Sequence, residues 1–440
     1  NEWSREPLLR LKGGALRDRL QLPRHCAINT FFNDMMGGYI IGPYLNEYYN
    51  GHDDEFHRQV ADVDARIQLV MDLRRGKLLK VFPYTVNGNT TWYAPTDIMP
   101  DSAVAPADRQ YMQNVFSLIY QEALTGNMAS VGNIADKMLR YQHKNGGSSL
   151  PSGMQTRAER LYNAVPFATI LFMLNLGMGF ATLFAVLWLM TRPTRRTLRG
   201  SMLMKIAVAV MLLSFAALTL CVALRWLIRG TAPMANGYET MLLMAWIIMA
   251  ASLLLCRRFA IVLTFGFIMS GFFLLVSHIS QMDPQITHIM PVLQSPLLSI
   301  HVSVIMTAFA LLSLTFICGI TALLLRAMRG SRAEGLAAQL AALRALSQLF
   351  YYPAMAALAV GIFVGAVWAN VSWGTYWSWD AKEVWALITF MVYAAAAHGT
   401  SLPMMRRPMP WHVFMVAAFA TILMTYFGVN YFLGGIHSYA

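Results

Sequence analysis

Indole rings gather in one short part of the chain, residues 371–385, between two strongly apolar stretches. The aromatic residues of this Trp-rich loop are Trp373, Tyr376, Trp377, Trp379 and Trp385. Tryptophan is costly to leave in water, so several at one membrane boundary predict a surface for a large, flat, apolar ligand. Haem is the leading candidate. The alternative is an ordinary aromatic belt, because Trp and Tyr gather at the interfaces of most membrane proteins.

Two acids in the Trp-rich loop, Asp380 and Glu383, come just before an apolar stretch. Acids favour the N-termini of helices, so we expect this pair to cap and position a helix that begins near Lys382. A role in proton transfer is the second interpretation.

Haem iron binds imidazole, and a histidine in a membrane segment is costly enough to need a reason. His301 opens one apolar span, and His437 lies in the C-terminal Gly-Gly-Ile-His-Ser-Tyr-Ala sequence. We expect both at the level of the Trp-rich loop, where a haem on the loop could be ligated from both faces. For each histidine alone, a hydrogen-bonded interfacial role is the alternative.

His398 lies near the opposite, inner end of a span, after four alanines that leave room for a bulky ligand. An ionisable residue there is a functional candidate by default. The alternative is a side chain that reaches to the inner headgroups. We interpret the other histidines of this half as structural, namely His278, His288 and His412.

Two arginines, Arg225 and Arg229, come just before a short connection that contains Asn236, with Glu239 beyond it. We expect them on the side of the Trp-rich loop, where a guanidinium could hold a haem propionate by a charge-assisted pair. Interfacial solvation or an ion pair with Glu239 is the alternative.

The composition indicates a membrane protein, since 57% of the 440 residues are hydrophobic and 13% are charged. Much of the net charge of +12 lies in short Arg-rich connections, which indicates membrane topology rather than nucleic-acid binding. The four cysteines form no Cys-x-x-Cys pair, so a disulfide framework, a zinc site and a dithiol redox centre are poorly supported. The chain begins with Asn and has no signal peptide, so we interpret it as a piece of a longer polypeptide.

Two domains are expected, a mostly helical soluble domain over 1–160 and a membrane domain over 161–440. In the first, apolar spacing predicts helices over 56–70 and 112–123, and Asn87-Gly88 predicts a hairpin within 77–93. The second has eight apolar spans of roughly 20 residues, the length that crosses a bilayer. The spans centre near Leu176, Leu213, Ile247, Phe267, Leu311, Val360, Met391 and Ile422. The fold class predicted is therefore an all-α polytopic membrane protein.

Arg-rich connections follow the first, third, fifth and seventh spans, which places all of them on one side. Excess Lys and Arg marks the cytoplasmic side, so the soluble domain, the Trp-rich loop and the C-terminus are expected outside. A leucine-spaced connection over 331–348 could lie along the inner membrane surface, but we interpret it as only a linker helix.

Several of these sequences resemble one known family. Trp373-Gly-x-x-Trp377-x-Trp379-Asp380, the Pro291-to-His301 stretch, Asn236-x-x-Glu239 and the terminal Ile-His-Ser-Tyr-Ala are similar to the CcsA-type haem-handling proteins of the System II cytochrome c maturation pathway. The resemblance covers roughly 162–440. It implies a multi-pass protein of the bacterial inner membrane, with the soluble domain, the Trp-rich loop and the C-terminus on the periplasmic side.

The resemblance also implies the ligand and its contacts. Haem b would be both substrate and ligand, held outside the membrane by the Trp-rich loop with His301 and His437 as axial ligands, while His398 would belong to an inner site on the export route. The implied haem contacts in the loop are Trp373, Tyr376, Trp377, Trp379, Asp380 and Trp385. The second inner ligand would come from a CcsB (ResB-like) partner, separate or fused upstream.

The implied activity is that of a holocytochrome c synthase. The thiols of a Cys-x-x-Cys-His motif in apocytochrome c would add across the haem vinyl groups, with reduced apocytochrome supplied by thiol-reducing proteins. Three rival functions stay open: a haem exporter without synthase activity, a membrane electron carrier, and an unrelated transporter whose aromatic loop is a lid. An electron carrier would need paired histidines on facing spans, and His398 has no such partner in this sequence.

Overall fold

The computed structural model describes residues 2–11, 14–33, 38–52, 54–97, 104–191, 201–278, 282, 284–286, 295–330, 335–399 and 401–433. The chain divides into two compact units, Asn1–Pro151 and Ser152–Ala440. Helix α6 (Gly153–Ala164), placed by the sequence at the end of the soluble domain, belongs to the second unit, because it packs on α8 (Met202–Arg229).

The first unit holds two small hydrophobic cores. One is built on α3 (Glu55–Arg74), where Phe56, Val60, Val63 and Ile67 recur at helical spacing and are buried. The predicted helix over 56–70 is therefore confirmed. Around α3 lie short elements: η1 (Glu2–Arg5), β1 (Leu9–Arg10), α1 (Ala15–Arg19), β2 (His25–Cys26), η2 (Ile28–Phe31), β3 (Phe32–Asn33), β4 (Gly38–Tyr39) and α2 (Gly42–Tyr49).

The other core joins a β-hairpin to two helices. Strands β5 (Phe82–Val86) and β6 (Asn89–Tyr93) pair antiparallel, and Asn87 and Gly88 between them both have positive φ, as a tight two-residue hairpin turn requires. The predicted hairpin is confirmed. Its Phe82 packs with buried side chains of the two helices α4 (Pro106–Leu124) and α5 (Met128–Asn145). A short 3-10 turn, η3 (Gly147–Ser149), follows α5.

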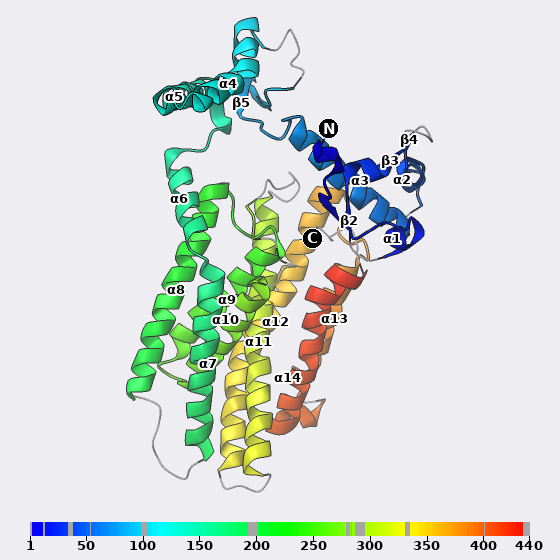
Figure 1. The fold of residues 1–440 in the computed structure, drawn as a ribbon. Coiled ribbons are helices and arrows are strands. Elements are labelled where there is room, and N and C mark those ends of the chain that lie inside the picture. The colour runs from blue at the N-terminus through cyan, green and yellow to red at the C-terminus, as the bar shows by residue number, and fades with distance from the viewer. Residues whose placement is uncertain are drawn as a thin grey trace. The chain divides into compact units, whose positions relative to one another are not determined.

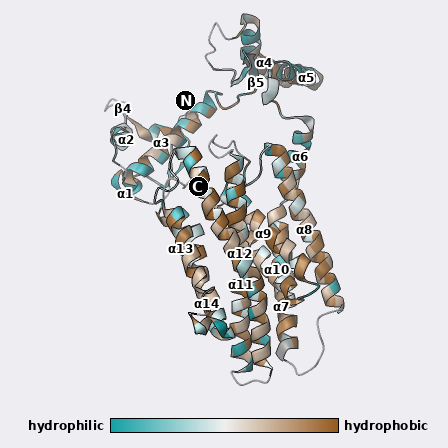
Figure 2. Cartoon of the chain, turned by 180° about the vertical axis from the view of Figure 1, so that it is seen from behind, coloured by the Kyte–Doolittle hydropathy of each residue, from teal (hydrophilic) through white to brown (hydrophobic). Residues whose placement is uncertain are grey.

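The second unit is an all-helical bundle, which confirms the predicted fold class (Figure 1). Its helices are α6, α7 (Phe167–Thr191), α8, α9 (Gly237–Leu255), α10 (Ile261–His278), α11 (Pro296–Arg329), α12 (Leu336–Trp373), α13 (Ala381–Ala395), η5 (Pro403–Arg406), α14 (Pro408–Leu423) and the π-helix η6 (Met424–Leu433). Hydrophobic residues dominate the long helices (Figure 2). Within the described residues, seven helices are long and apolar enough to cross a membrane.

The seventh of the eight predicted spans, centred near Met391, is shorter than expected. It forms α13, whose 15 residues extend about 22 Å at 1.5 Å per residue, against the roughly 30 Å of a bilayer core. The apolar sequence continues beyond Ala395, but the backbone leaves the helix there in a turn.

Buried polar side chains join the membrane helices. The Asn175 amide of α7 donates a hydrogen bond to Ser270 Oγ of α10 at 3.1 Å and accepts one from Ser214 Oγ of α8 at 2.8 Å. In a membrane bundle, where lipid is as apolar as leucine, such bonds help to select which helices associate.

For the residues that the structure describes, 336–348, the predicted helix is present, but it is neither a separate linker nor a helix on the membrane surface. Residues 336–348 are the start of α12, and their leucines are buried in the main core of the bundle. A leucine stripe has the same spacing whether it meets lipid headgroups or other helices, so the sequence could not separate the two. Pro353, a usual helix breaker, lies inside α12.

Candidate haem-handling site

The Trp-rich loop connects two helices of opposite direction. Helix α12 ends at Trp373, Gly374 follows with a φ of +79°, and α13 begins at Ala381. The Trp373 ring packs edge-on against Trp368 with a centroid separation of 4.8 Å, and the Trp377 ring packs edge-on against Trp379 at 6.2 Å. The loop and the last turns of α12 thus carry two pairs of edge-packed indoles at one end of the bundle.

Trp379 is held in a strained backbone conformation. Its φ is +59°, in the left-handed region that costs an L-residue about 1–2 kcal/mol. Its side chain is 77% exposed, so the strain is not balanced by burial of the ring within this chain. An observed backbone outlier that presents a large apolar ring to the outside is a reason to infer a binding role.

Asp380 and Glu383 form the predicted cap of the following helix. Asp380 accepts a hydrogen bond from the Lys382 backbone N–H at 3.1 Å, and Glu383 accepts one from the Asp380 backbone N–H at 3.3 Å. Glu383 also accepts from the Ser378 N–H at 2.9 Å. The capping interpretation is confirmed, and both carboxylates hold the shape of the loop.

His301 lies in the second turn of α11 and faces α12, which packs along it. Its Nδ1 is 2.8 Å from the carbonyl oxygen of Gly361. A carbonyl only accepts, so the ring nitrogen Nδ1 donates, and the lone pair of the neutral imidazole is on Nε2. A hydrogen bond of this kind commonly fixes the tautomer and orientation of a histidine that ligates a metal through its other nitrogen.

Glycines in α12 make this approach feasible. A Cβ on Gly365 would lie 2.7 Å from His301 Nδ1, and a Cβ on Gly361 would lie 2.5 Å from the Cδ1 atom of Ile305, one turn further along α11. The pair is a Gly-x-x-x-Gly sequence, which lets two membrane helices pack closely. Sequence reasoning missed this pair, although its spacing was a readable signal.

The structure places His301 at the same end of the bundle as the Trp-rich loop. Gly365, which contacts the ring, is eight residues before Trp373, or about 12 Å along the helix axis. His437, the expected ligand on the other face, lies outside the described residues.

The structure does not place His398 near His301 or the Trp-rich loop. It follows the C-terminal end of α13, the full length of that helix from the Trp-rich loop, and its side chain is exposed. The preceding turn lies against α12, where the Tyr351 hydroxyl donates to the carbonyl of Tyr393 at 2.7 Å. An exposed imidazole at this end is open to a ligand or a residue from outside the chain.

Arg225 and Arg229 are engaged by Glu239, so the ion pair that was the alternative to propionate contact is what the structure shows. Arg225 Nη2 and Arg229 Nη1 lie 2.7 and 2.6 Å from the two Glu239 oxygens, and both the Arg225 and Glu239 side chains are fully buried. Arg225 Nη1 also donates to the Tyr162 hydroxyl at 2.6 Å and to the Pro284 carbonyl at 2.7 Å. These contacts tie α6, α8 and α9 together, and they commit Arg225 to the fold.

His412 agrees with its structural interpretation. It is fully buried, and its Nε2 lies 3.2 Å from the carbonyl oxygen of Leu340. His278 likewise lies 3.2 Å from the Thr169 hydroxyl of α7. His288 lies outside the described residues.

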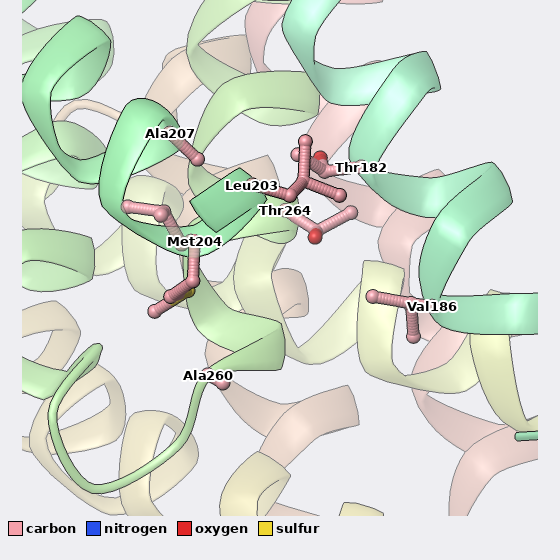
Figure 3. A pocket seen from close by; sticks show the side chains of 8 residues that line it. Thr182, Val186, Leu203, Met204, Ala207, Ala260 and Thr264 are labelled. Carbon is pink, nitrogen blue, oxygen red and sulfur yellow. The ribbon is translucent and has the colours of Figure 1, made fainter. Parts of the chain in front are cut away.

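Two internal cavities of the bundle are too small for a porphyrin. One, of about 10 Å³, lies where α7 and α8 meet the start of α10 and is lined by apolar side chains with Thr182 and Thr264 (Figure 3). The other, of about 20 Å³, is lined by residues such as Met241, Phe309 and Tyr426. Pockets that enclose drug-sized ligands have roughly 300–1,000 Å³. Neither cavity competes with the exposed surface of the Trp-rich loop as a haem site.

Comparisons with known proteins agree with the motifs. The family described as Cytochrome C assembly protein matches residues 234–437. The chain is 29% identical to the protein NrfI of Wolinella succinogenes over its full length, which is 48% of NrfI. It is 33% identical to the cytochrome c biogenesis protein CcsA of Synechococcus sp. strain CC9605, over 54% of this chain and 86% of that protein, and 31% identical to CcsA of Guillardia theta, over 52% and 83%.

The chain covers a different share of the length of NrfI than of the CcsA proteins. It spans about half the length of NrfI but more than four-fifths of these CcsA proteins. The family match over residues 234–437 contains the Trp-rich loop, His301 and Glu239. The chain therefore belongs to the CcsA-type family of cytochrome c biogenesis proteins, and it is a multi-pass membrane protein.

Proposed function

We propose that this protein presents haem at the Trp-rich loop for covalent attachment to apocytochrome c, as a holocytochrome c synthase. The observation that carries the proposal is the placement of His301, whose Nδ1 donates to the Gly361 carbonyl at 2.8 Å, the kind of bond that orients a histidine that ligates a metal. Membership of the CcsA-type family and the exposed, strained Trp379 point to the same ligand.

In this proposal the chain binds and orients haem b rather than attacking it. His301 and His437 ligate the iron from opposite faces, while the aromatic side chains Trp373, Tyr376, Trp377, Trp379 and Trp385 offer an apolar surface to the ring. Asp380 keeps the loop in shape. Because haem carries the reactive vinyl groups, the protein needs no nucleophile of its own.

The attachment chemistry is balanced without an external oxidant or reductant. Each thiol of the apocytochrome Cys-x-x-Cys-His motif adds across one vinyl double bond, so one C–S and one C–H bond form while the S–H bond and the π bond break. Holding the vinyl edge toward the entering peptide supplies proximity, which in favourable cases lowers barriers by about 7–11 kcal/mol. The histidine of the peptide then displaces His301 or His437, and the product leaves.

The remaining partners follow from the same proposal. His398 belongs to an inner site on the export route, and its exposure suits a second ligand from a CcsB (ResB-like) partner, separate or fused. Thiol-reducing proteins keep the apocytochrome reduced. The Arg-rich connections indicate that the Trp-rich loop lies outside the bacterial inner membrane. A propionate contact by Arg225 or Arg229 would compete with the ion pairs that both arginines form with Glu239.

A haem exporter or haem-binding subunit without synthase activity is the second candidate, since it would use the same ligands. An attachment assay separates the two. Purified protein with haem, with and without a CcsB-like partner, is mixed with reduced apocytochrome, and thioether formation is measured by haem that stays with the polypeptide after denaturation. The proposal predicts attachment, lost in a peptide whose two cysteines are serine. Haem transfer without covalent product would favour the exporter.

A further inference from the structure

The end of helix α3 carries leucines that its own core does not cover. Four of them are largely exposed, at 57, 63, 47 and 54%: Leu69, Leu73, Leu78 and Leu79. The packed face of α3 is the separate stripe that includes Val60, Val63 and Ile67. This helix therefore has a second apolar surface, which continues past its C-terminal end.

Basic residues alternate with these leucines. The sequence from Leu73 is Leu-Arg-Arg-Gly-Lys-Leu-Leu-Lys, so four cations stand within eight residues, and Asp72 is the one acid in the range 69–80. Arg75 and Lys80 are exposed, and Lys77 is partly exposed. We name residues 69–80 the basic leucine segment.

The segment has a defined shape. Lys77 N–H donates to the Asp72 carbonyl at 3.0 Å and Gly76 N–H donates to the Leu73 carbonyl at 3.0 Å, while Gly76 has a φ of +71°. This is the Schellman arrangement that ends a helix and reverses the chain. Leu69 and Leu73 lie one turn apart on the same side of α3, and Leu78 and Leu79 leave the turn just beyond them.

Leucines among lysines and arginines match the chemistry of an anionic lipid surface. Apolar side chains enter the boundary between headgroups and acyl chains, while cations remain at the phosphates. The same chain continues at Ser152 into a membrane-spanning unit, so the segment works at a high effective concentration of bilayer. A protein partner would cover the leucines equally well, but it would not require four cations beside them.

We propose that the basic leucine segment docks the first unit onto the headgroups of anionic phospholipids. This surface shares no residue with the proposed haem site.

The test uses the full chain in nanodiscs, with a nitroxide label on Leu78→Cys. The four native cysteines are buried, so the introduced thiol is the reactive one. Collision with oxygen, which concentrates in lipid, is compared with collision with a water-soluble nickel chelate. In phosphatidylglycerol nanodiscs the ratio of oxygen to nickel collision should be several-fold higher than in phosphatidylcholine nanodiscs.

Leu124→Cys supplies a matched control. Leu124 is the last residue of α4, is 69% exposed, and has no Lys or Arg between residues 110 and 136. For a label at this position, the ratio of oxygen to nickel collision should be the same in both lipids. In the triple variant Arg75→Gln, Lys77→Gln, Lys80→Gln, the collision ratio of the Leu78→Cys label should likewise no longer differ between the two lipids.

Two results would overturn the proposal. A Leu78 label open to the nickel chelate in both lipids would show a solvated surface. A label shielded from both probes would show a protein contact instead. Neither result bears on haem binding, so this proposal can fail while the proposed function stands.

Discussion

His301 Nδ1 on α11 lies 2.8 Å from the carbonyl oxygen of Gly361 on α12. The bond orients the imidazole against a neighbouring helix that leads, eight residues after Gly365, to the Trp-rich loop. One contact thus connects the position of the expected iron ligand with the loop expected to hold the porphyrin, because both depend on α12.

Gly365→Ala should disturb this relationship selectively. The added methyl would overlap the His301 ring, and such overpacking costs about 1–3 kcal/mol unless the ring turns away. We expect weaker haem retention and a changed absorption spectrum in a variant that still assembles in the membrane. Gly177→Ala in α7 is the control, because its Cβ would meet no atom within 4 Å. Equal spectra for both variants would contradict the positioning role of Gly365.

Trp379→Gly should separate backbone strain from ligand binding. Glycine adopts the φ of +59° without penalty, so the loop should gain about 1–2 kcal/mol of local stability, while the exposed indole is lost. The expected result is a thermal unfolding midpoint that is unchanged or higher, together with a clear loss of bound haem. If the variant retains haem as well as the wild type, Trp379 is not part of the binding surface.

Glu239→Gln should destabilise the membrane unit strongly. The substitution leaves two guanidinium groups buried beside a neutral amide, and removing one partner of a buried ion pair costs about 3–5 kcal/mol. Unfolding of the purified chain in detergent measures the loss. The same change at Glu159, which is exposed on α6, should have little effect. A Glu239→Gln variant as stable as the Glu159→Gln control would argue against a structural role for the cluster.

The first unit should lose stability through His57 as the pH rises above 6.5. Its pKa is raised above the ordinary 6.5, chiefly by the hydrogen bond to Glu47 at 2.9 Å, with Asp54 adding to this and burial opposing it. The stabilisation is complete below pH 6.5 and is lost as the pH rises through the raised pKa. Asp54, whose pKa is lowered mainly by the His57 backbone N–H, contributes above pH 3.8 and loses that contribution as the pH falls through its lowered pKa.

Hydrogen exchange of the α3 amides in the full chain measures this dependence. Protection should fall as the pH rises through the raised pKa of His57, and the fall should disappear in the double variant Glu47→Gln, Asp54→Asn. His52, whose ring is 5.9 Å from that of His57, is the other titratable neighbour, so His52→Gln should keep the dependence. Substitution of the exposed His143 provides a second control. If the pH dependence of protection persists in the double variant, groups other than the pairs of His57 with Glu47 and Asp54 cause it.

Much of the fold could be predicted from patterns among residues that are close in sequence. The apolar spacing from Phe56 to Ile67, the Asn87-Gly88 turn and the Asp380–Glu383 cap each depend on neighbours in sequence, and all three are present. Hydropathy located the membrane helices for the same reason, since a span is defined by its own composition.

Predictions of features that depend on residues far apart in sequence were left undecided or were wrong. The sequence could not decide between a propionate and Glu239 as the partner of Arg225, because that depends on how α8 and α9 face each other. The leucines of 336–348 were interpreted as part of a linker helix, although they open α12 and pack in the bundle. The contact between His301 and Gly361 joins residues sixty positions apart, which no periodicity reveals.

The central claim is that His301 ligates haem beside the Trp-rich loop. The most direct test is the absorption spectrum of the purified full chain, compared between wild type and His301→Ala, with and without free imidazole. The account predicts a bis-imidazole haem spectrum in the wild type, its loss in the variant, and its recovery when imidazole is added. A wild-type chain that never carries haem, or a variant with an unchanged spectrum, would contradict it.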